Sequence, residues 1–192
     1  LTAIKCGGHN SAGKGSCNGG IMIDLSPMQG VRVDPIARTA TVAGGSLLNA
    51  LDEETQAFGL ATTSGTVSHT GVGGLSLGGG FGRLARRFGL AVDNIEAVDI
   101  INADGQFRRA CAEENADLYW GVRGGGGNFG VVTSFDFKLH PMAHQIIGGR
   151  ISFPYSNAKD LLKFYADYSQ SVPDDMYVDI VIFAPPMGYG KT

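Results

Sequence analysis

The residue of this chain with the most chemically suggestive neighbours is His9, which lies in the run Lys5-Cys6-Gly7-Gly8-His9-Asn10-Ser11. A second glycine block occupies residues 71–82. Glycine has no Cβ, so its N–H can approach a ligand closely, and consecutive N–H groups form a concave nest for phosphate oxygens. Two such blocks on one chain indicate one large, flat, polyanionic cofactor. A histidine that projects from the first nest can contact that cofactor directly.

Composition excludes several classes of partner. The formal net charge is −3, so the chain lacks the basic footprint that binding to a nucleic-acid backbone requires. No apolar stretch approaches the ~18 residues needed to span a bilayer, so no membrane partner is expected. The three cysteines, Cys6, Cys17 and Cys111, have no C-x-x-C spacing and indicate neither a disulfide framework nor a zinc site. We therefore expect no metal, and no feature indicates an oligomeric state.

Short strands and helices alternate along residues 1–141, which is typical of an α+β fold. Apolar–polar alternation predicts hairpins that turn at Asp34-Pro35 and at 102–105. The strands predicted in this part of the chain are 21–25, 31–34, 39–43, 95–101, 106–110 and 131–139. The chain already begins inside a strand at Leu1, which indicates that upstream residues are missing.

Helices are predicted between these strands. Leu47, Leu48, Leu51 and Phe58 recur at helical spacing, with Ser46 as the expected N-cap and Gly59 as the stop signal. A basic helical turn is expected within 82–89 and a short apolar helix at 118–122.

The chain changes character near Met142. A strand at 150–153, a helix at 158–168 and a strand at 176–183 follow one another, as in the beginning of a second domain. We expect one domain at residues 1–141 and an incomplete second domain at 142–192.

Several other motifs resemble known functional sites, but the residues around them argue against those functions. The stretch 80–85 fits G-x-G-x-x-A but follows glycine instead of a strand, which argues against a Rossmann site. The stretch 188–192 imitates the end of a P-loop, but Pro185 occupies the position of the first glycine. No nucleophile elbow occurs, and the neighbours Ser68 and His69 do not by themselves make a catalytic pair. His140 and His144 are interpreted as structural.

Four motifs in order resemble those of a known family: Gly7-Gly8-His9-Asn10, then 65–74 with 78–82, then 89–94, then 127–133. Together they resemble the FAD-linked oxidases with a vanillyl-alcohol-oxidase-type, or PCMH-type, FAD-binding domain. Within that family the chain is most similar to the bacterial berberine-bridge-enzyme-like and 6-hydroxynicotine-oxidase-like members. The resemblance implies the second lobe of the FAD-binding domain, with its N-terminal lobe missing, followed by the start of an α+β substrate-binding domain.

The resemblance also implies a role for each motif. The first run would be the pyrophosphate loop, with Cys6, Gly7, Gly8, Asn10 and Ser11, and His9 would bond covalently to the 8α-methyl group of FAD. The second run would lie against the isoalloxazine ring and ribityl chain. Its contact residues would be Gly65, Thr66, Thr70, Gly71, Gly73, Gly74, Leu75 and Gly78. The backbone of Gly130, Val131 and Val132 would contact the adenine end.

Departures from the family pattern refine this expectation. Bicovalent members have a cysteine where this chain has Val67, so a single covalent link is expected. Thr70 and Leu75 stand where plant members have valine and histidine, which leaves the rate of reoxidation by oxygen open.

The implied reaction transfers a hydride from an alcohol, sugar or amine C–H bond to covalently bound FAD, which O2 reoxidises. The substrate would be a small molecule, and the catalytic base is expected outside this chain. The alternatives are a non-covalent flavin reductase or dehydrogenase, and a flavin-binding or sequestration protein without turnover. The expected compartment is the bacterial cytoplasm, although a missing N-terminus leaves room for a signal peptide.

Overall fold

The computed structural model of the chain describes residues 1–183, which form two compact units. The first unit is Leu1–Gln145, and the second begins at Ile146. Helices and strands are both present in the first unit, which confirms the mixed α and β prediction. The P-loop-like stretch at 188–192 lies outside the described residues.

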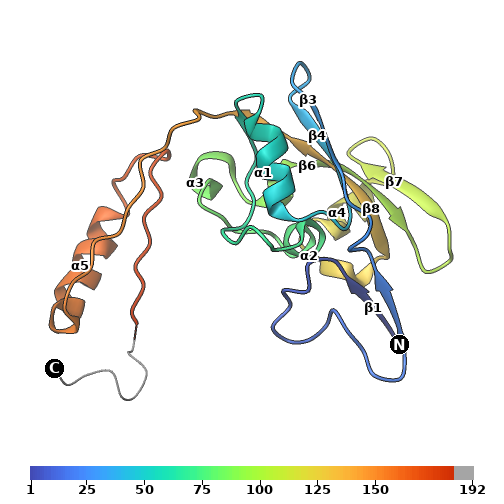
Figure 1. Cartoon of the computed structure of the whole chain (residues 1–192), viewed down its shortest axis with the longest axis horizontal. Coiled ribbons are helices and arrows are strands. Elements are labelled where there is room, and N and C mark those ends of the chain that lie inside the picture. Colours follow the sequence, from blue (N-terminus) through green and yellow to red (C-terminus); the bar gives the residue numbers. More distant parts are fainter. Residues whose placement is uncertain (184–192) are drawn as a thin grey trace. The chain divides into compact units, whose positions relative to one another are not determined.

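A five-stranded antiparallel sheet forms the centre of the first unit (Figure 1). Its strands run in the order β3 (Val31–Asp34), β4 (Thr39–Ala43), β8 (Val131–Lys138), β6 (Ile95–Ile101) and β7 (Phe107–Cys111). Strands β3 and β4 form one hairpin and β6 and β7 another, so both predicted hairpins are confirmed. Strand β8, the last of the five in sequence, pairs with β4 on one side and with β6 on the other.

The hydrophobic core lies against this sheet. Phe135 of β8 is fully buried and lies opposite both Val42 of β4 and Val98 of β6. Three helices add buried side chains to the same cluster: α1 (Leu48–Gln56), α2 (Val72–Leu77) and α4 (Ala116–Val122). Because alternate residues of a strand point to opposite faces, the alternation that predicted these strands is the pattern of core and non-core positions.

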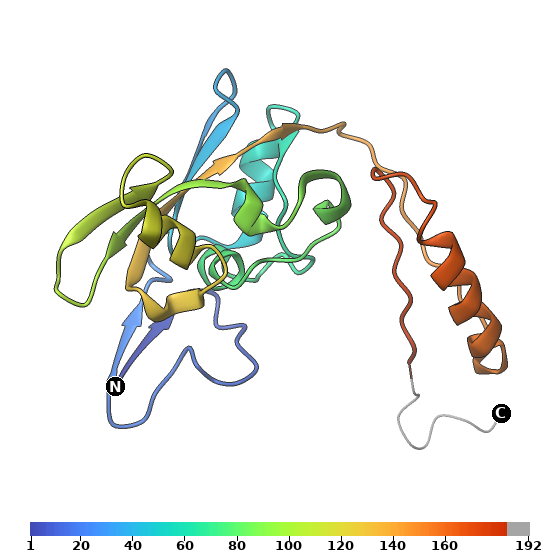
Figure 2. The same ribbon diagram turned by 180° about the vertical axis from the view of Figure 1, so that it is seen from behind.

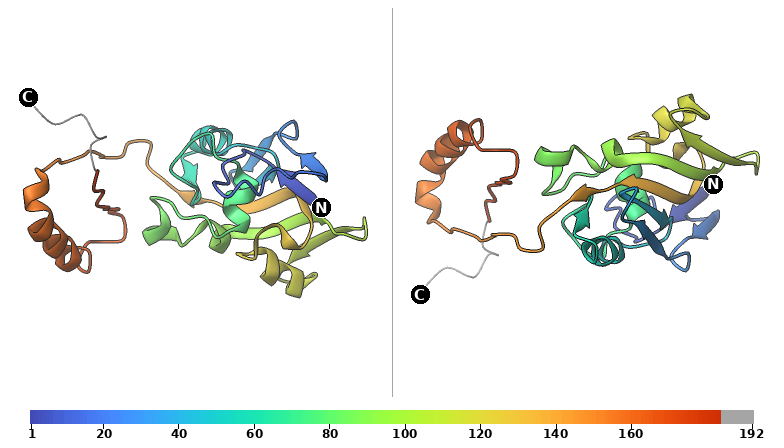
Figure 3. Two further views of the ribbon diagram at one scale, coloured as in Figure 1. Left: turned by 90° about the horizontal axis from the view of Figure 1, so that it is seen from below. Right: turned by 90° about the horizontal axis from the view of Figure 1, so that it is seen from above.

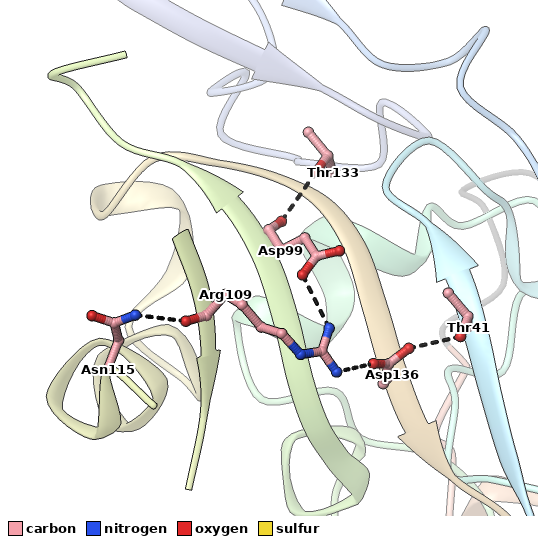
Figure 4. A network of polar contacts seen from close by, with 6 residues as sticks. All are labelled: Thr41, Asp99, Arg109, Asn115, Thr133 and Asp136. Carbon is pink, nitrogen blue, oxygen red and sulfur yellow. Dashed lines mark hydrogen bonds and ion pairs between the residues drawn. The ribbon is translucent and has the colours of Figure 1, made fainter. Parts of the chain in front are cut away.

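The residues that alternate with the core positions form a polar network (Figure 4). Arg109 of β7 donates one hydrogen bond to Asp99 of β6 over 3.0 Å and another to Asp136 of β8 over 2.6 Å. The hydroxyl of Thr41 on β4 donates to the other oxygen of Asp136 over 2.8 Å. These carboxylates, Asp136 above all, raise the pKa of Arg109 above its usual value. The network therefore links four neighbouring strands.

The predicted N-cap of helix α1 is wrong. The N-cap residue is Leu47, which makes no capping hydrogen bond through its side chain. The Ser46 side chain is buried instead, and its hydroxyl both accepts from the N–H of Gly30 over 3.1 Å and donates to the carbonyl of Gly30 over 3.2 Å. Ser46 thus ties the helix to the segment before β3, and other groups must satisfy the first N–H groups of α1.

Two smaller sheets flank the first one. Strands β1 (Thr2–Lys5) and β2 (Ile21–Asp24) pair in parallel, and the connection at residues 6–20 carries the first glycine run (Figures 1 and 3). Strands β5 (Leu60–Ala61) and β9 (His140–Pro141) form a short antiparallel pair. The connections contain α3 (Ala85–Phe88), η1 (Ala91–Asn94) and η2 (Gly126–Asn128). The basic turn predicted within 82–89 is confirmed as α3.

The second unit contains the turn η3 (Tyr155–Asn157) and helix α5 (Ala158–Tyr168), which confirms the predicted helix (Figure 2). The strands predicted at 150–153 and 176–183 are wrong, since both segments are extended but unpaired within the described residues. The second of them lies beside α5, where the hydroxyl of Tyr165 donates to the carbonyl of Val178 over 3.1 Å. An extended apolar segment becomes a strand only through a neighbouring strand, which neither segment has here.

Candidate cofactor site

The two glycine runs meet backbone to backbone. A Cβ on Gly7 would overlap the amide nitrogen of Gly71 and would lie 2.8 Å from its Cα. A Cβ on Gly71 would in turn overlap the amide nitrogen of Gly7 and the sulfur of Cys6. Both positions therefore need glycine, because real Cβ atoms essentially never come this close to backbone. Two motifs far apart in sequence are thus parts of one surface.

The first glycine run exposes its histidine. Gly8 has a φ of +71°, a conformation that side-chain-bearing residues rarely adopt, and His9 directly after it is exposed. The side-chain oxygen of Asn10 accepts from the N–H groups of Ala12 over 3.0 Å and Lys14 over 3.1 Å. Asn10 therefore shapes the loop from within, whereas His9 is left free to face a ligand.

An ion pair anchors the start of the same loop. The ammonium of Lys5 lies 2.8 Å from a carboxylate oxygen of Asp24 on β2. This hydrogen bond, with further ones from Ser26, lowers the pKa of Asp24 to about 2. Cys6 donates to the carbonyl of Ser46 over 3.6 Å, so its thiol is directed into the fold.

The segment 68–70 caps helix α1 and holds a second histidine. The N–H of Leu48 donates to the carbonyl of Thr70 over 3.0 Å, and that of Asn49 donates to the carbonyl of Ser68 over 2.9 Å. Between these two carbonyls lies His69, whose exposed ring centroid is 4.5 Å from that of His9, with the planes tilted by 54°. Sequence reasoning missed this pairing, because nothing local connects two loop histidines so far apart.

Helix α2 presents the second glycine run. Gly73 is buried, and a Cβ there would lie 3.1 Å from the carbonyl oxygen of Gly44. Gly74 is exposed, and a Cβ there would meet nothing within 4 Å. The side chain of Leu75 turns back against Gly65, where a Cβ would lie 2.5 Å from it. The half-buried Leu75 therefore packs against the loop at Gly65.

The remaining predicted contacts of this run lie at its ends. Thr66 is exposed, and Thr70 is half-buried beside the Gly7 contact. Gly78 is exposed and forms the C-cap of α2.

The loop before the last predicted stretch, residues 130–132, reaches the C-terminal end of α2. The N–H of Gly124 donates to the carbonyl of Leu77 over 3.1 Å. Beyond it, Val131 and Val132 pair with β6, and the Val132 side chain is buried. A Cβ on Gly130 would lie 3.1 Å from the Cα of Asn102. The side-chain oxygen of Asn102 is buried without a hydrogen-bond partner among residues 1–183, so it offers an unused acceptor beside this stretch.

The other histidines and cysteines have different surroundings. His140 stacks on Phe88 at 4.1 Å and shares a 2.6 Å hydrogen bond with the side-chain oxygen of Asn94. Burial, with smaller effects from Lys138 and Arg87, lowers the pKa of His140. All three cysteines are free. Within the described part of the chain, no group of three or more histidine, cysteine or acidic side chains could hold a metal ion. None of the described helices is long and apolar enough to cross a bilayer.

Gly74 shows that the site suits a flat ligand. A glycine inside a helix costs about 1 kcal/mol relative to alanine. Gly74 lies inside α2, and no neighbouring atom of the chain would obstruct a side chain there. Packing within the chain therefore gives no reason for glycine at this position. A planar ligand lying against this turn of the helix would explain why the residue is glycine. The exposed His9 is on the loop that adjoins the same helix.

The family described as FAD binding domain matches residues 2–110 of the chain. The chain therefore belongs to this family of FAD-binding domains, and the PCMH-type resemblance inferred from its motifs is confirmed. FAD is accordingly the cofactor for which this fold is built.

Similar proteins support the same family. An FAD-linked oxidoreductase of Dictyostelium discoideum is 38% identical over 182 residues, covering 94% of this chain and 40% of that protein. A xylooligosaccharide oxidase of Thermothelomyces thermophilus is 38% identical over 166 residues, covering 83% of this chain and 33% of that protein. The crystal structure of 6-hydroxy-D-nicotine oxidase from Arthrobacter nicotinovorans is 37% identical with a TM-score of 0.72, covering 73% of this chain and 31% of that one. The chain thus spans 31% to 40% of the length of these relatives.

Proposed function

We propose that this chain is the flavin-holding part of an FAD-dependent oxidase, with FAD joined to His9 by one covalent bond. The reaction is the removal of a hydride from a C–H bond of an alcohol, sugar or amine, with O2 as the final electron acceptor. The observation that carries the proposal is the contact of Gly7 with Gly71. It joins the His9 loop and helix α2 into one surface without side chains, and a flat cofactor needs such a surface.

Each motif has a part in holding the cofactor. The N–H groups of the loop around Gly8 would hold the pyrophosphate, together with Cys6, Asn10 and Ser11 of the same run. The face of α2 at Gly74 would lie against the ring, and Gly65, Thr66, Thr70, Gly71 and Gly78 would border it. Beside Gly130, the side-chain oxygen of Asn102, which has no hydrogen-bond partner among residues 1–183, would add an acceptor to the backbone of 130–132, which suits the amino group of an adenine.

When bound, FAD supplies the hydride acceptor and the route of the electrons to oxygen. The residues of this chain supply binding and orientation. His9 would hold the edge of the ring through the covalent bond, so the cofactor would not dissociate between turnovers. Val67, which is 42% exposed near His69, has no nucleophilic atom and cannot provide a second link.

The substrate is proposed to be a small molecule. Two similar proteins are named as oxidases of a xylooligosaccharide and of a nicotine derivative, which supports this class. We propose that the unit from Ile146 onward begins the substrate-binding domain and that the catalytic base lies in that domain. We assign the role of catalytic base in substrate oxidation to no residue of the site within residues 1–183.

Mass spectrometry of the full-length protein tests the link. We expect one added FAD mass after denaturation, located on a peptide that contains His9. A His9→Ala variant should lose this mass and keep the far-ultraviolet circular dichroism of the wild type. An adduct that survives in His9→Ala would place the link elsewhere, and free FAD released from the wild type would contradict a covalent link.

A Gly74→Ala variant tests the surface itself. The added methyl group meets nothing in the chain, so the apoprotein should be slightly more stable than the wild type, by about 0.5–1 kcal/mol. Flavin binding, measured by fluorescence quenching, should nevertheless weaken. Gly148→Ala is the matched control, since a Cβ there also meets nothing but lies in the other unit. Equal flavin affinity in the two variants would show that the ring does not lie at α2.

A further inference from the structure

We propose that His69 is the base that accepts the proton of His9 when the bond to the flavin forms. The inference deepens the proposed function and rests on it, because it presumes that His9 is the attachment point. It rests on the contact of the two imidazole rings, whose centroids are 4.5 Å apart.

The backbone on both sides holds this pair in place. The loop of His9 is fixed by the contact of Gly7 with Gly71, which lies two residues after His69. His69 is fixed because the carbonyls of its neighbours, Ser68 and Thr70, both accept hydrogen bonds from the start of α1. The two rings are therefore brought together by backbone contacts and not by the flexibility of long side chains.

The fold has little use for the pair as a packing contact. Both histidines are exposed, and among the residues the structure describes neither ring has a hydrogen-bond partner. Substitutions at exposed positions without such contacts usually change stability by no more than about 0.5 kcal/mol. His140 shows the contrasting case, with its short hydrogen bond to Asn94 and its stacking on Phe88. Two free imidazoles side by side at the attachment point fit a chemical role better than a structural one.

The attachment reaction needs such a base. One C–H bond of the flavin 8α-methyl group and the N–H bond of His9 break, and one C–N bond forms. The two electrons released pass through the flavin ring to O2, which takes up two protons to give hydrogen peroxide. As one nitrogen of His9 bonds to carbon, the proton on the other nitrogen must leave. With its ring centroid 4.5 Å from that of His9, His69 can take up that proton through one water, and its exposed ring can pass the proton to solvent.

The test follows attachment over time in the full-length protein. Apoprotein from riboflavin-limited cells is mixed with FAD, and covalent flavin is measured by mass and by fluorescence on a denaturing gel. His69→Gln and His69→Phe should attach FAD ~100-fold more slowly than the wild type, or slower still, since a positioned base contributes about 10²–10⁴-fold. Phenylalanine keeps the ring shape without its nitrogens, and rapid non-covalent binding of FAD should stay close to wild type in both. His144→Gln removes an exposed imidazole elsewhere and should attach at the wild-type rate.

Chemical rescue separates a base from a structural residue. Added imidazole should restore attachment to His69→Ala in proportion to its concentration, which a purely structural role would not allow. If the His69 variants attach FAD as fast as the wild type, while His9→Ala attaches none, the role of His69 is overturned and the proposed link stands. If the wild type binds FAD only non-covalently, or His9→Ala keeps the adduct, the proposed link fails and this inference fails with it.

Discussion

In the five-stranded sheet, large side chains make the contacts between strands, and Phe135 is fully buried opposite Val42 and Val98. At the junction of the two glycine runs, Gly7 and Gly71 lie so close that neither has room for a single methyl group. Packed side chains stabilise the sheet, whereas the two loops can approach each other only because their glycines have no side chain. The first kind of contact builds stability, and the second leaves backbone N–H groups and one histidine open to a ligand.

The largest effect should come from removing side-chain volume in the sheet. Phe135→Ala leaves a cavity in the core and should lower the free energy of unfolding by about 3–5 kcal/mol. Urea denaturation of the full-length protein measures the change. Phe107→Ala, at a position that is 60% exposed on β7, should stay close to the wild type. Similar losses in the two variants would contradict the account of the core.

At the junction of the two glycine runs, adding a side chain should lower stability and flavin binding. Gly7→Ala forces the backbone of Gly71 to move and should cost about 1–3 kcal/mol, with loss of bound flavin. Gly15→Ala is the matched control in the same connection, since a Cβ there meets nothing within 4 Å. Absorbance of bound flavin and thermal unfolding report both effects. A Gly7→Ala protein that binds flavin like Gly15→Ala would show that the two runs need no such contact.

A smaller effect is expected on the polar face of the sheet. Arg109→Met leaves Asp99 and Asp136 without their shared cation and should lower stability by about 1 kcal/mol, since the arginine is 42% exposed. Arg108 is as exposed, but within residues 1–183 its one ion pair is with Asp104, so Arg108→Met should cost less. The difference should shrink in high salt, because salt screens these charges. Equal losses in both variants would argue against a cooperative network.

The smallest effect concerns the ion pair that anchors the His9 loop. The pKa of Asp24 is lowered to about 2 from 3.8, mainly by Lys5. The stabilisation that this gives is therefore present above about pH 4 and is lost as the pH falls towards 2. In Lys5→Met, the pKa of Asp24 should rise but stay below 3.8, because Ser26 still donates to it over 2.9 Å. Carboxyl NMR titration measures this shift, with Lys14→Met as control, and an unchanged value would contradict the assignment.

The sheet could be predicted from sequence because its signal is local. Along 39–43 the core and non-core positions alternate within the strand itself, and along 95–101 they alternate except at Ala97 and Val98, which are both buried. The turns between strands have their own residue types. Ser46 shows the limit of such reasoning. A serine before a helical pattern is typical of an N-cap, but its hydroxyl has a better partner in Gly30, which adjoins it only in the folded chain. The segments 150–153 and 176–183 have strand-like patterns, but no neighbouring strand pairs with them among residues 1–183.

The site could be predicted only in part. The glycine runs pointed to a cofactor because a missing Cβ is a property of the residue itself. The contact of His9 with His69 could not be predicted in this way, since it depends on how two loops meet. The same holds for Asn102, which the sequence presents only as the start of a hairpin turn. Loop-to-loop contacts leave no periodic trace, and the chemistry of this site depends on them.

The position of β8 has a consequence for how the protein is made. This strand occupies the middle of the sheet but is synthesised after the other four. The hairpins β3–β4 and β6–β7 therefore cannot join into one sheet until β8 is available. Until residue 138 has left the ribosome, each hairpin has an open edge that can pair with another chain. Nascent chains should accordingly need protection from aggregation up to that point. Truncation just before Val131 should yield insoluble protein, and not a smaller folded domain.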